Sequence, residues 1–212
     1  MLIEIGHLSL IMALSLSTIT AIAALVGSLY CWINWERLAC SLVPLTLLLI
    51  SISFFSLVYG FIVSDFSLRV VFENSHSSKP LIYKISGTWG NHEGSMLLWV
   101  LLLSFFASLV IWFGKNLDQR FKTVVVGVQT SILVMFLSFL IFSSNPFSRI
   151  LVPHLEGKGL NPVLQDPGLA FHPPFLYLGY VGLSVSFSFA IAALLLGKID
   201  YVWARWVRPW TL

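Results

Sequence analysis

The stretch "LSLIMALSLSTITAIAALVGSLYCWI", Leu8–Ile33, decides the fold because it carries no charged residue along its whole length. It exceeds the ~20 residues that an α-helix needs to cross a ~30 Å hydrocarbon core. Four further runs share this property: Ala39–Ser64, Ser95–Gly114, Thr123–Ser143 and Phe175–Gly197. A helix satisfies its backbone hydrogen bonds within one segment, as lipid requires. The sequence therefore predicts an all-α polytopic membrane protein with about five transmembrane helices.

The composition supports this interpretation. Hydrophobic residues make up 58% of the chain, charged residues 10%, and the mean hydropathy is +0.90. Soluble domains carry roughly 25% charged residues. The first run has no basic residue before it and is longer than the apolar part of a signal peptide, so we expect it to be retained as a span. The net charge of +3 comes from residues in short connectors rather than from a basic stripe, which argues against a nucleic-acid partner.

The distribution of the basic residues predicts the orientation. The connectors after the first, third and fifth runs hold seven of the twelve: Arg37, Lys115, Arg120, Lys122, Lys198, Arg205 and Arg208. The two longer connectors, about 65–92 and 144–174, hold the other five at lower density. By the positive-inside rule the longer connectors are outer loops. We therefore expect the N-terminus outside and the C-terminus in the cytoplasm.

No internal repeat or low-complexity linker divides the chain, so residues 1–212 are expected to form a single membrane domain. The five runs contain no Asp, Glu, Lys or Arg, the groups that proton relays and ion pathways normally need at mid-depth. This argues against a pump or channel built from this segment alone. Gln129, in the fourth run, is expected to make helix–helix hydrogen bonds rather than to bind a ligand.

The first outer loop ends in "GTWGNHEGSMLLW", where Trp89, His92 and Glu93 immediately precede the third run. Trp89 suits either an interfacial anchor or a wall for a flat ligand. Glu93 would complement the dipole at the start of the third helix and is a possible partner for His92. We take His92 and Glu93 as a possible docking element.

The second outer loop, "SNPFSRILVPHLEGKGLNPVLQDPGLAFHPP", is punctuated by prolines at positions 146, 153, 162, 167, 173 and 174. Prolines fix the backbone at many points, and a long loop with its own rigidity is more often a functional surface than a spacer. A residue before proline is disfavoured in the helical region, whereas proline suits a first helical turn. His172 is therefore expected at the N-cap edge of the fifth span, at the outer boundary of the membrane.

His172 can be interpreted in two ways. Neutral imidazole is a good axial ligand for haem iron, and the flat macrocycle prefers aromatic walls. The side chains that could form such walls are Trp89, Phe171, Phe175, Tyr177 and Tyr180. Alternatively, His172 caps a helix or bonds a carbonyl, and the same structural interpretation applies to His92.

Several stretches resemble the cytochrome c maturation protein F (CcmF) family, which includes paralogous assembly proteins dedicated to nitrite reductase. They are "IEIGHLSLIMAL", "FIVSDFSLRVVFENS", "TWGNHEGSMLLWVLLLS", "SNPFSR", "LNPVLQDPGLAFHPPFLYLGYVG" and "ARWVRPWTL". The resemblance extends along essentially the whole chain. It implies that this chain is the amino-terminal part of a larger protein of haem-lyase type.

The resemblance also implies a function in cytochrome c-type biogenesis at the bacterial inner membrane. Family members are understood to receive haem b from a haem chaperone and to promote its attachment to apocytochrome c with other maturation subunits. His172 matches an external histidine of the family and would be an axial ligand for the transferred haem. The ligands of the family's internal structural haem would lie in later helices. Whether this chain acts as an enzyme on its own stays open, and the alternatives are a non-catalytic membrane scaffold or a haem transporter subunit.

Overall fold

The computed structural model describes residues 1–152, 154–199 and 201–211 of the chain. Five long helices dominate it: α1 (Leu2–Tyr30), α2 (Ile33–Ile62), α5 (His92–Phe113), α6 (Gln119–Phe142) and α7 (Pro167–Leu196). All five are long and apolar enough to cross a membrane. The shorter helices are α3 (Arg69–Asn74), α4 (Leu81–Gly87) and α8 (Tyr201–Thr211), with 3₁₀ turns at Gly114–Asn116 and Pro162–Leu164. These ranges contain no β-strand, so the all-α, five-span prediction is confirmed.

The helices extend beyond the apolar runs that predicted them. α1 begins at Leu2 and includes Glu4, while α7 begins at Pro167, eight residues before the run at Phe175. Apolar composition marks the part of a helix that lies in lipid, whereas hydrogen bonding continues into polar residues at either end. The connector between the first two helices is likewise shorter than the apolar runs predicted, because α1 ends at Tyr30 and α2 already begins at Ile33. Cys31 takes a left-handed conformation (φ 57°), and the Trp32 amide bonds the Gly27 carbonyl 2.8 Å away, which ends α1 abruptly.

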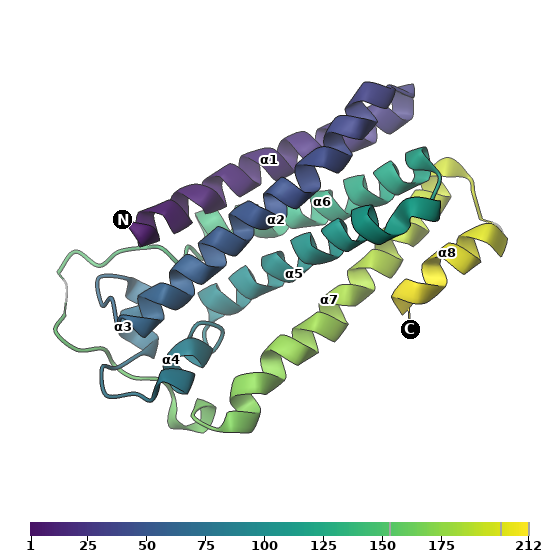
Figure 1. The fold of residues 1–212 in the computed structure, drawn as a ribbon. Helices are drawn as coiled ribbons and strands as arrows, with labels where there is room; N and C mark the ends of the chain where they lie inside the picture. The colour runs from purple at the N-terminus through teal and green to yellow at the C-terminus, as the bar shows by residue number, and fades with distance from the viewer. Residues whose placement is uncertain (153, 200, 212) are drawn as a thin grey trace.

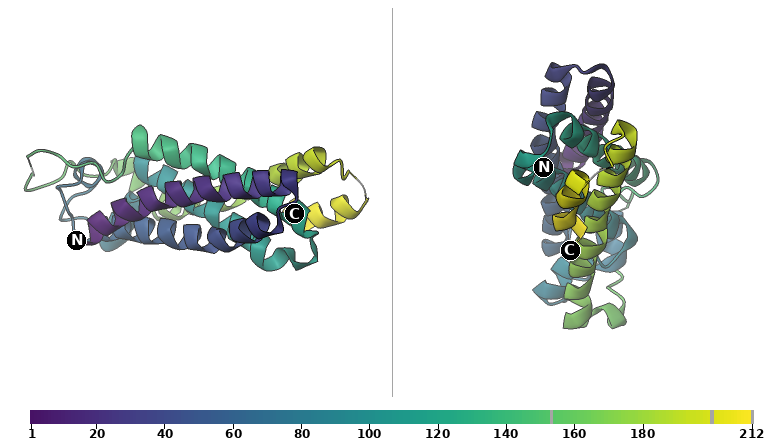
Figure 2. Two further views of the ribbon diagram at one scale, coloured as in Figure 1. Left: turned by 90° about the horizontal axis from the view of Figure 1, so that it is seen from above. Right: turned by 90° about the vertical axis from the view of Figure 1, so that its right-hand side faces the viewer.

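The long helices form an elongated bundle (Figures 1 and 2). α1 packs against α2 and α6, α5 lies against α2, α6 and α7, and α7 packs mainly against α5 and α6, with smaller contacts to α8 and α4. The N-terminus, α3 and α4 lie at one end of the bundle, and α8 lies at the other (Figure 1). We call the end that holds α3, α4 and the two long connectors the loop end. α7 is an edge helix of the bundle, and much of its other face is exposed (Figure 1).

A polar contact joins α6 to α7 inside this apolar bundle. Gln129 is only 1% exposed; its Nε2 donates to Ser184 Oγ at 2.7 Å, and its Oε1 accepts from Ser188 Oγ at 2.7 Å. Ser184 and Ser188 both lie on α7. The expected helix–helix role of Gln129 is confirmed, since both polar ends of its side chain are used in this contact.

The two long connectors fold onto each other at the loop end. The Arg69 amide bonds the Ser148 carbonyl at 2.9 Å, and the Ile150 amide bonds the Ser67 carbonyl at 3.0 Å. Further along, the Lys158 amide bonds the Phe72 carbonyl at 2.7 Å. Prolines therefore do not order the second loop alone: backbone hydrogen bonds to the first loop do much of it. Pro153, one of the prolines in the sequence argument, lies outside the described residues.

At the opposite end, α8 folds back against the bundle. Trp206 and Trp210 lie against Phe121 and Phe189, with ring centroids 5.4 and 6.1 Å apart respectively. The sequence argument treated residues 198–212 as a basic connector and missed this helix. Trp203, Trp206 and Trp210 recur at helical spacing, and this period was the available signal.

Replacing Gln129 with Leu tests the polar contact between α6 and α7. The variant leaves Ser184 and Ser188 without their interhelical partner, so we expect the free energy of unfolding in detergent to fall by about 1 kcal/mol. Ser51→Ala is the control, because Ser51 Oγ bonds only the Leu47 carbonyl of its own helix. Equal stability of Gln129→Leu and Ser51→Ala would contradict the proposed contribution.

Candidate functional site

The loop end of α7 begins with a polar cap. Asp166 Oδ1 accepts a hydrogen bond from the Gly168 amide at 2.8 Å, and the Ala170 amide bonds the Asp166 carbonyl at 2.9 Å. Asp is a preferred N-cap residue, and Pro167 follows at the first helical position, where its missing N–H costs nothing. The Asp-Pro-Gly sequence therefore starts the helix earlier than the proline pair at 173 and 174.

This start corrects the expected place of His172. The sequence argument put it at the N-cap edge, but His172 lies within α7, in its second turn. The preference of a pre-proline residue for extended backbone is overridden here, because the cap at Asp166 has already set the helical path. The two prolines then lie inside the helix and remove the amide donors for the carbonyls four residues earlier.

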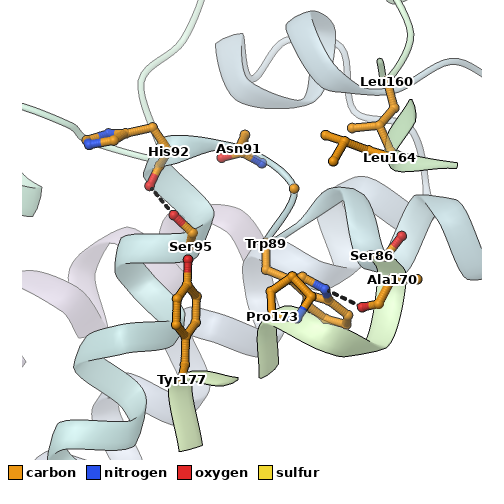
Figure 3. Close-up of a pocket in the computed structure, with 11 residues that line it drawn as sticks. Ser86, Trp89, Asn91, His92, Ser95, Leu160, Leu164, Ala170, Pro173 and Tyr177 are labelled. Atoms are coloured by element: carbon orange, nitrogen blue, oxygen red, sulfur yellow. Dashed lines mark hydrogen bonds between the residues drawn. The ribbon is translucent and has the colours of Figure 1, made fainter. Parts of the chain in front are cut away.

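Trp89 provides a replacement for one of these donors. Its indole Nε1 donates to the carbonyl oxygen of Ala170 at 2.8 Å (Figure 3). Ala170 is the residue whose carbonyl would accept from position 174, where Pro174 has no N–H. A buried carbonyl without a hydrogen-bond partner costs free energy. The indole N–H therefore replaces the donor that Pro174 lacks.

The loop that carries Trp89 is tightly built. Asn91 caps α5: its Oδ1 accepts from the Gly94 amide at 2.7 Å, and its Nδ2 donates to the Gly87 carbonyl at 2.6 Å. A Cβ on Gly94 would lie 1.6 Å from the carbonyl oxygen of Thr88, so only glycine fits there. Trp89 is therefore held between two fixed points of the backbone.

A pocket of about 310 Å³ lies between this loop and α7 (Figure 3). Its lining residues are Ser86, Trp89, Gly90, Asn91, His92, Ser95, Leu160, Leu164, Ala170, Pro173 and Tyr177. Among the described residues, no hydrogen bond or ion pair joins His92 to Glu93. The expected pairing is wrong, because the His92 Nδ1 lies 2.7 Å from Ser144 Oγ and the ring meets the edge of Phe139.

Tyr177 belongs to an aromatic contact between three helices. Its ring lies 5.5 Å from the ring of Trp99 on α5, and Trp99 stacks on Phe136 of α6 at 5.6 Å. Tyr180, one turn further along α7, meets the edge of the same indole at 5.6 Å. These contacts attach α7 to the bundle just below the pocket.

His172 lies on a different face of α7 from the pocket. Ala170, Pro173 and Tyr177 line the pocket, and a helix turns by about 100° per residue, so His172 is directed away from them. His172 is exposed, as are its neighbours Phe171 (55% exposed) and Phe175 (71% exposed). The structure thus divides the predicted haem-binding set in two. His172, Phe171 and Phe175 form what we call the outward face, while Trp89 and Tyr177 lie on the pocket side.

Five helices that can each cross a membrane, with two long connectors folded together at one end, define a polytopic membrane protein. The model of the family described as "Cytochrome C assembly protein" matches residues 89–212, more than half of the chain. The match begins at Trp89 and includes the whole of α5, α6 and α7. The chain therefore belongs to the cytochrome c assembly protein family.

Particular relatives match along the whole chain. It is 53% identical to the cytochrome c-type biogenesis protein ccl1 of Rhodobacter capsulatus and 44% identical to CcmF of Escherichia coli, with 100% of the chain covered in each case. A solved structure titled "Cytochrome c Heme Lyase CcmF" matches 99% of the chain with a TM-score of 0.86 and 29% identity. The chain spans 32%, 33% and 33% of these three proteins, about a third of their length.

Gly94→Ala tests whether the Trp89 loop is as tight as its contacts indicate. Because the new methyl group would overlap the Thr88 carbonyl, we expect a loss of more than about 2 kcal/mol in the free energy of unfolding in detergent. Gly179→Ala is the matched control, since a Cβ at Gly179 of α7 meets nothing within 4 Å. It should be neutral or slightly stabilising. A loop that accepts Gly94→Ala as easily as Gly179→Ala would contradict the assigned rigidity.

Proposed function

We propose that this chain supplies the haem-handling surface of a system I haem lyase, with His172 as an axial ligand of the haem in transit. The observation that carries the proposal is the exposure of His172 between two exposed phenylalanines on the outward face of α7. An imidazole with open space in front of it can meet iron, and the flanking rings offer apolar surface to a porphyrin. Trp89 and Tyr177 would support the helix from behind and would not wall this haem.

The family and the shape of the bundle support a place in the inner membrane of a bacterium. The loop end would face the side where cytochromes c are assembled, together with the N-terminus, and the opposite end would face the cytoplasm. The basic residues Lys115, Lys122, Arg205 and Arg208 belong to elements at that opposite end (Figure 1), which supports a cytoplasmic position for it by the positive-inside rule. Haem b would thus be received and held at the outer edge of the bilayer.

The chemistry served at this surface would be thioether formation on apocytochrome c. Each cysteine thiol adds across a haem vinyl group, so that a C–S bond forms and the thiol hydrogen ends on the neighbouring carbon. No electrons are gained or lost in that addition. His172 would contribute position: it holds the iron on one face so that the vinyl groups present a fixed edge to the incoming cysteines.

Other parts of a longer protein would complete the activity. A second axial ligand and the ligands of an internal haem are expected from the two thirds of the relatives' length that this chain does not cover. A haem chaperone, apocytochrome c and other maturation subunits would meet the loop end. His92 and Glu93 stay a predicted docking element there. The names of the relatives favour cytochrome c biogenesis over a haem transporter or a scaffold without a role in haem attachment.

Haem titration of the purified chain in detergent tests the ligand assignment. His172→Ala should weaken haem binding at least about tenfold and remove the absorption signature of imidazole ligation. His92→Ala is the control, because it removes, from the same end of the bundle, an imidazole that contacts Ser144 and Phe139 and does not lie on α7. Identical affinity and spectra for the unmodified chain and His172→Ala would refute the role of His172 as a ligand.

A further inference from the structure

The hydrogen bond from Trp89 Nε1 to the Ala170 carbonyl joins the first loop to the turn of α7 that carries His172. We infer that Trp89 is a positioning residue for His172, acting through the backbone of α7 as a substitute for the amide that Pro174 lacks. This inference rests on the proposed function of His172. It concerns how the ligand is aimed, since Trp89 itself would touch neither haem nor cytochrome.

The first step is the weakness of the helix at this point. Pro173 and Pro174 remove two successive intrahelical hydrogen bonds about two turns after the N-cap, and proline within a helix commonly kinks or opens it. His172 lies in the turn that would bend. Without another constraint, the direction of its side chain would vary with every change in the path of that turn.

The second step is the quality of the replacement. Ala170 is 3% exposed, so water competes poorly for its carbonyl, and the 2.8 Å distance is that of a good N–H···O bond. The indole is delivered by the loop that Asn91 clamps and that Gly94 keeps narrow. A rigid donor on a rigid loop therefore fixes the carbonyl of the turn that bears His172.

The third step is the division of α7 into two faces. The bond from Trp89 and the ring contact between Tyr177 and Trp99 hold the helix at two successive places on the pocket side. Neither contact covers the outward face, where His172 and Phe175 lie exposed. This arrangement allows the ligand to be both fixed in direction and open to a porphyrin.

A double-mutant cycle isolates the hydrogen bond from the bulk of the indole. Trp89→Phe keeps an aromatic ring and removes the N–H. Pro174→Ala restores a backbone N–H four residues after Ala170, so the carbonyl regains an intrahelical donor. A structural loss caused by the smaller ring would not be repaired by a change on α7, whereas a loss caused by the missing donor would be.

The readouts are haem titration with absorption spectra and hydrogen exchange of the first turns of α7, both on the full chain in detergent. We expect Trp89→Phe to weaken haem binding about fivefold to tenfold, to increase the non-imidazole fraction of the spectrum and to speed exchange in these turns. Pro174→Ala should stay within about twofold of the unmodified chain, and the double variant should return to that range. Trp112→Phe, an exposed tryptophan of α5, is the control and should change nothing.

The outcomes separate this inference from the proposed function. The positioning role of Trp89 is overturned if His172→Ala loses haem but Trp89→Phe does not. It is also overturned if Pro174→Ala fails to rescue Trp89→Phe. In both cases the assignment of His172 as a haem ligand is unaffected. If His172→Ala binds haem normally, the proposed function fails and the positioning role fails with it. Faster exchange in Trp89→Phe that the double variant reverses would then still establish the hydrogen bond as a support of the helix alone.

Discussion

A polypeptide in lipid must provide hydrogen-bond partners for its own backbone N–H and C=O groups. The rest of this structure depends on how α7 meets that requirement. The helix carries two successive prolines near its loop end, and each takes away an amide that a carbonyl needs. The indole of Trp89 satisfies one of those carbonyls from a different loop. A local defect in one helix thereby becomes a tertiary contact, and the first loop, the pocket and the path of α7 become one structural unit.

That unit gives a physical basis for the proposed role of His172. Helices at the edge of a bundle usually bury one face and expose the other to lipid or to partners. α7 follows this rule along its length, but at its loop end the exposed face carries an imidazole flanked by phenylalanines. The buried face meanwhile receives a hydrogen bond from Trp89 and a ring contact from Trp99 of α5. The contacts that support the helix and the proposed ligand therefore lie on opposite sides of the same turn.

The sequence predicted the number of spans correctly, and failed where a local cap sets the start of a helix. Apolar runs identify helices that lie in lipid, so five runs became five helices. They do not identify where a helix begins, and Asp166 with Pro167 begins α7 well before its run. That earlier start decides which face His172 occupies and separates it from Trp89 and Tyr177. The pair of prolines did contain a usable signal, since two missing amides imply carbonyls that need donors from elsewhere.

The contact between the two long connectors at the loop end has a different consequence. A Cβ on Gly157 would lie 2.1 Å from the Ser75 carbonyl, so the two connectors meet backbone to backbone there. The stretch just before it is different: Leu151 and Leu155 are almost fully exposed. Changes of length during evolution, or a linker inserted by design, would be tolerated next to Leu151, before the stacked rings of His154 and Phe72. The same insertion at Gly159 would separate the two connectors, because the Gly159 amide bonds the Ser75 carbonyl.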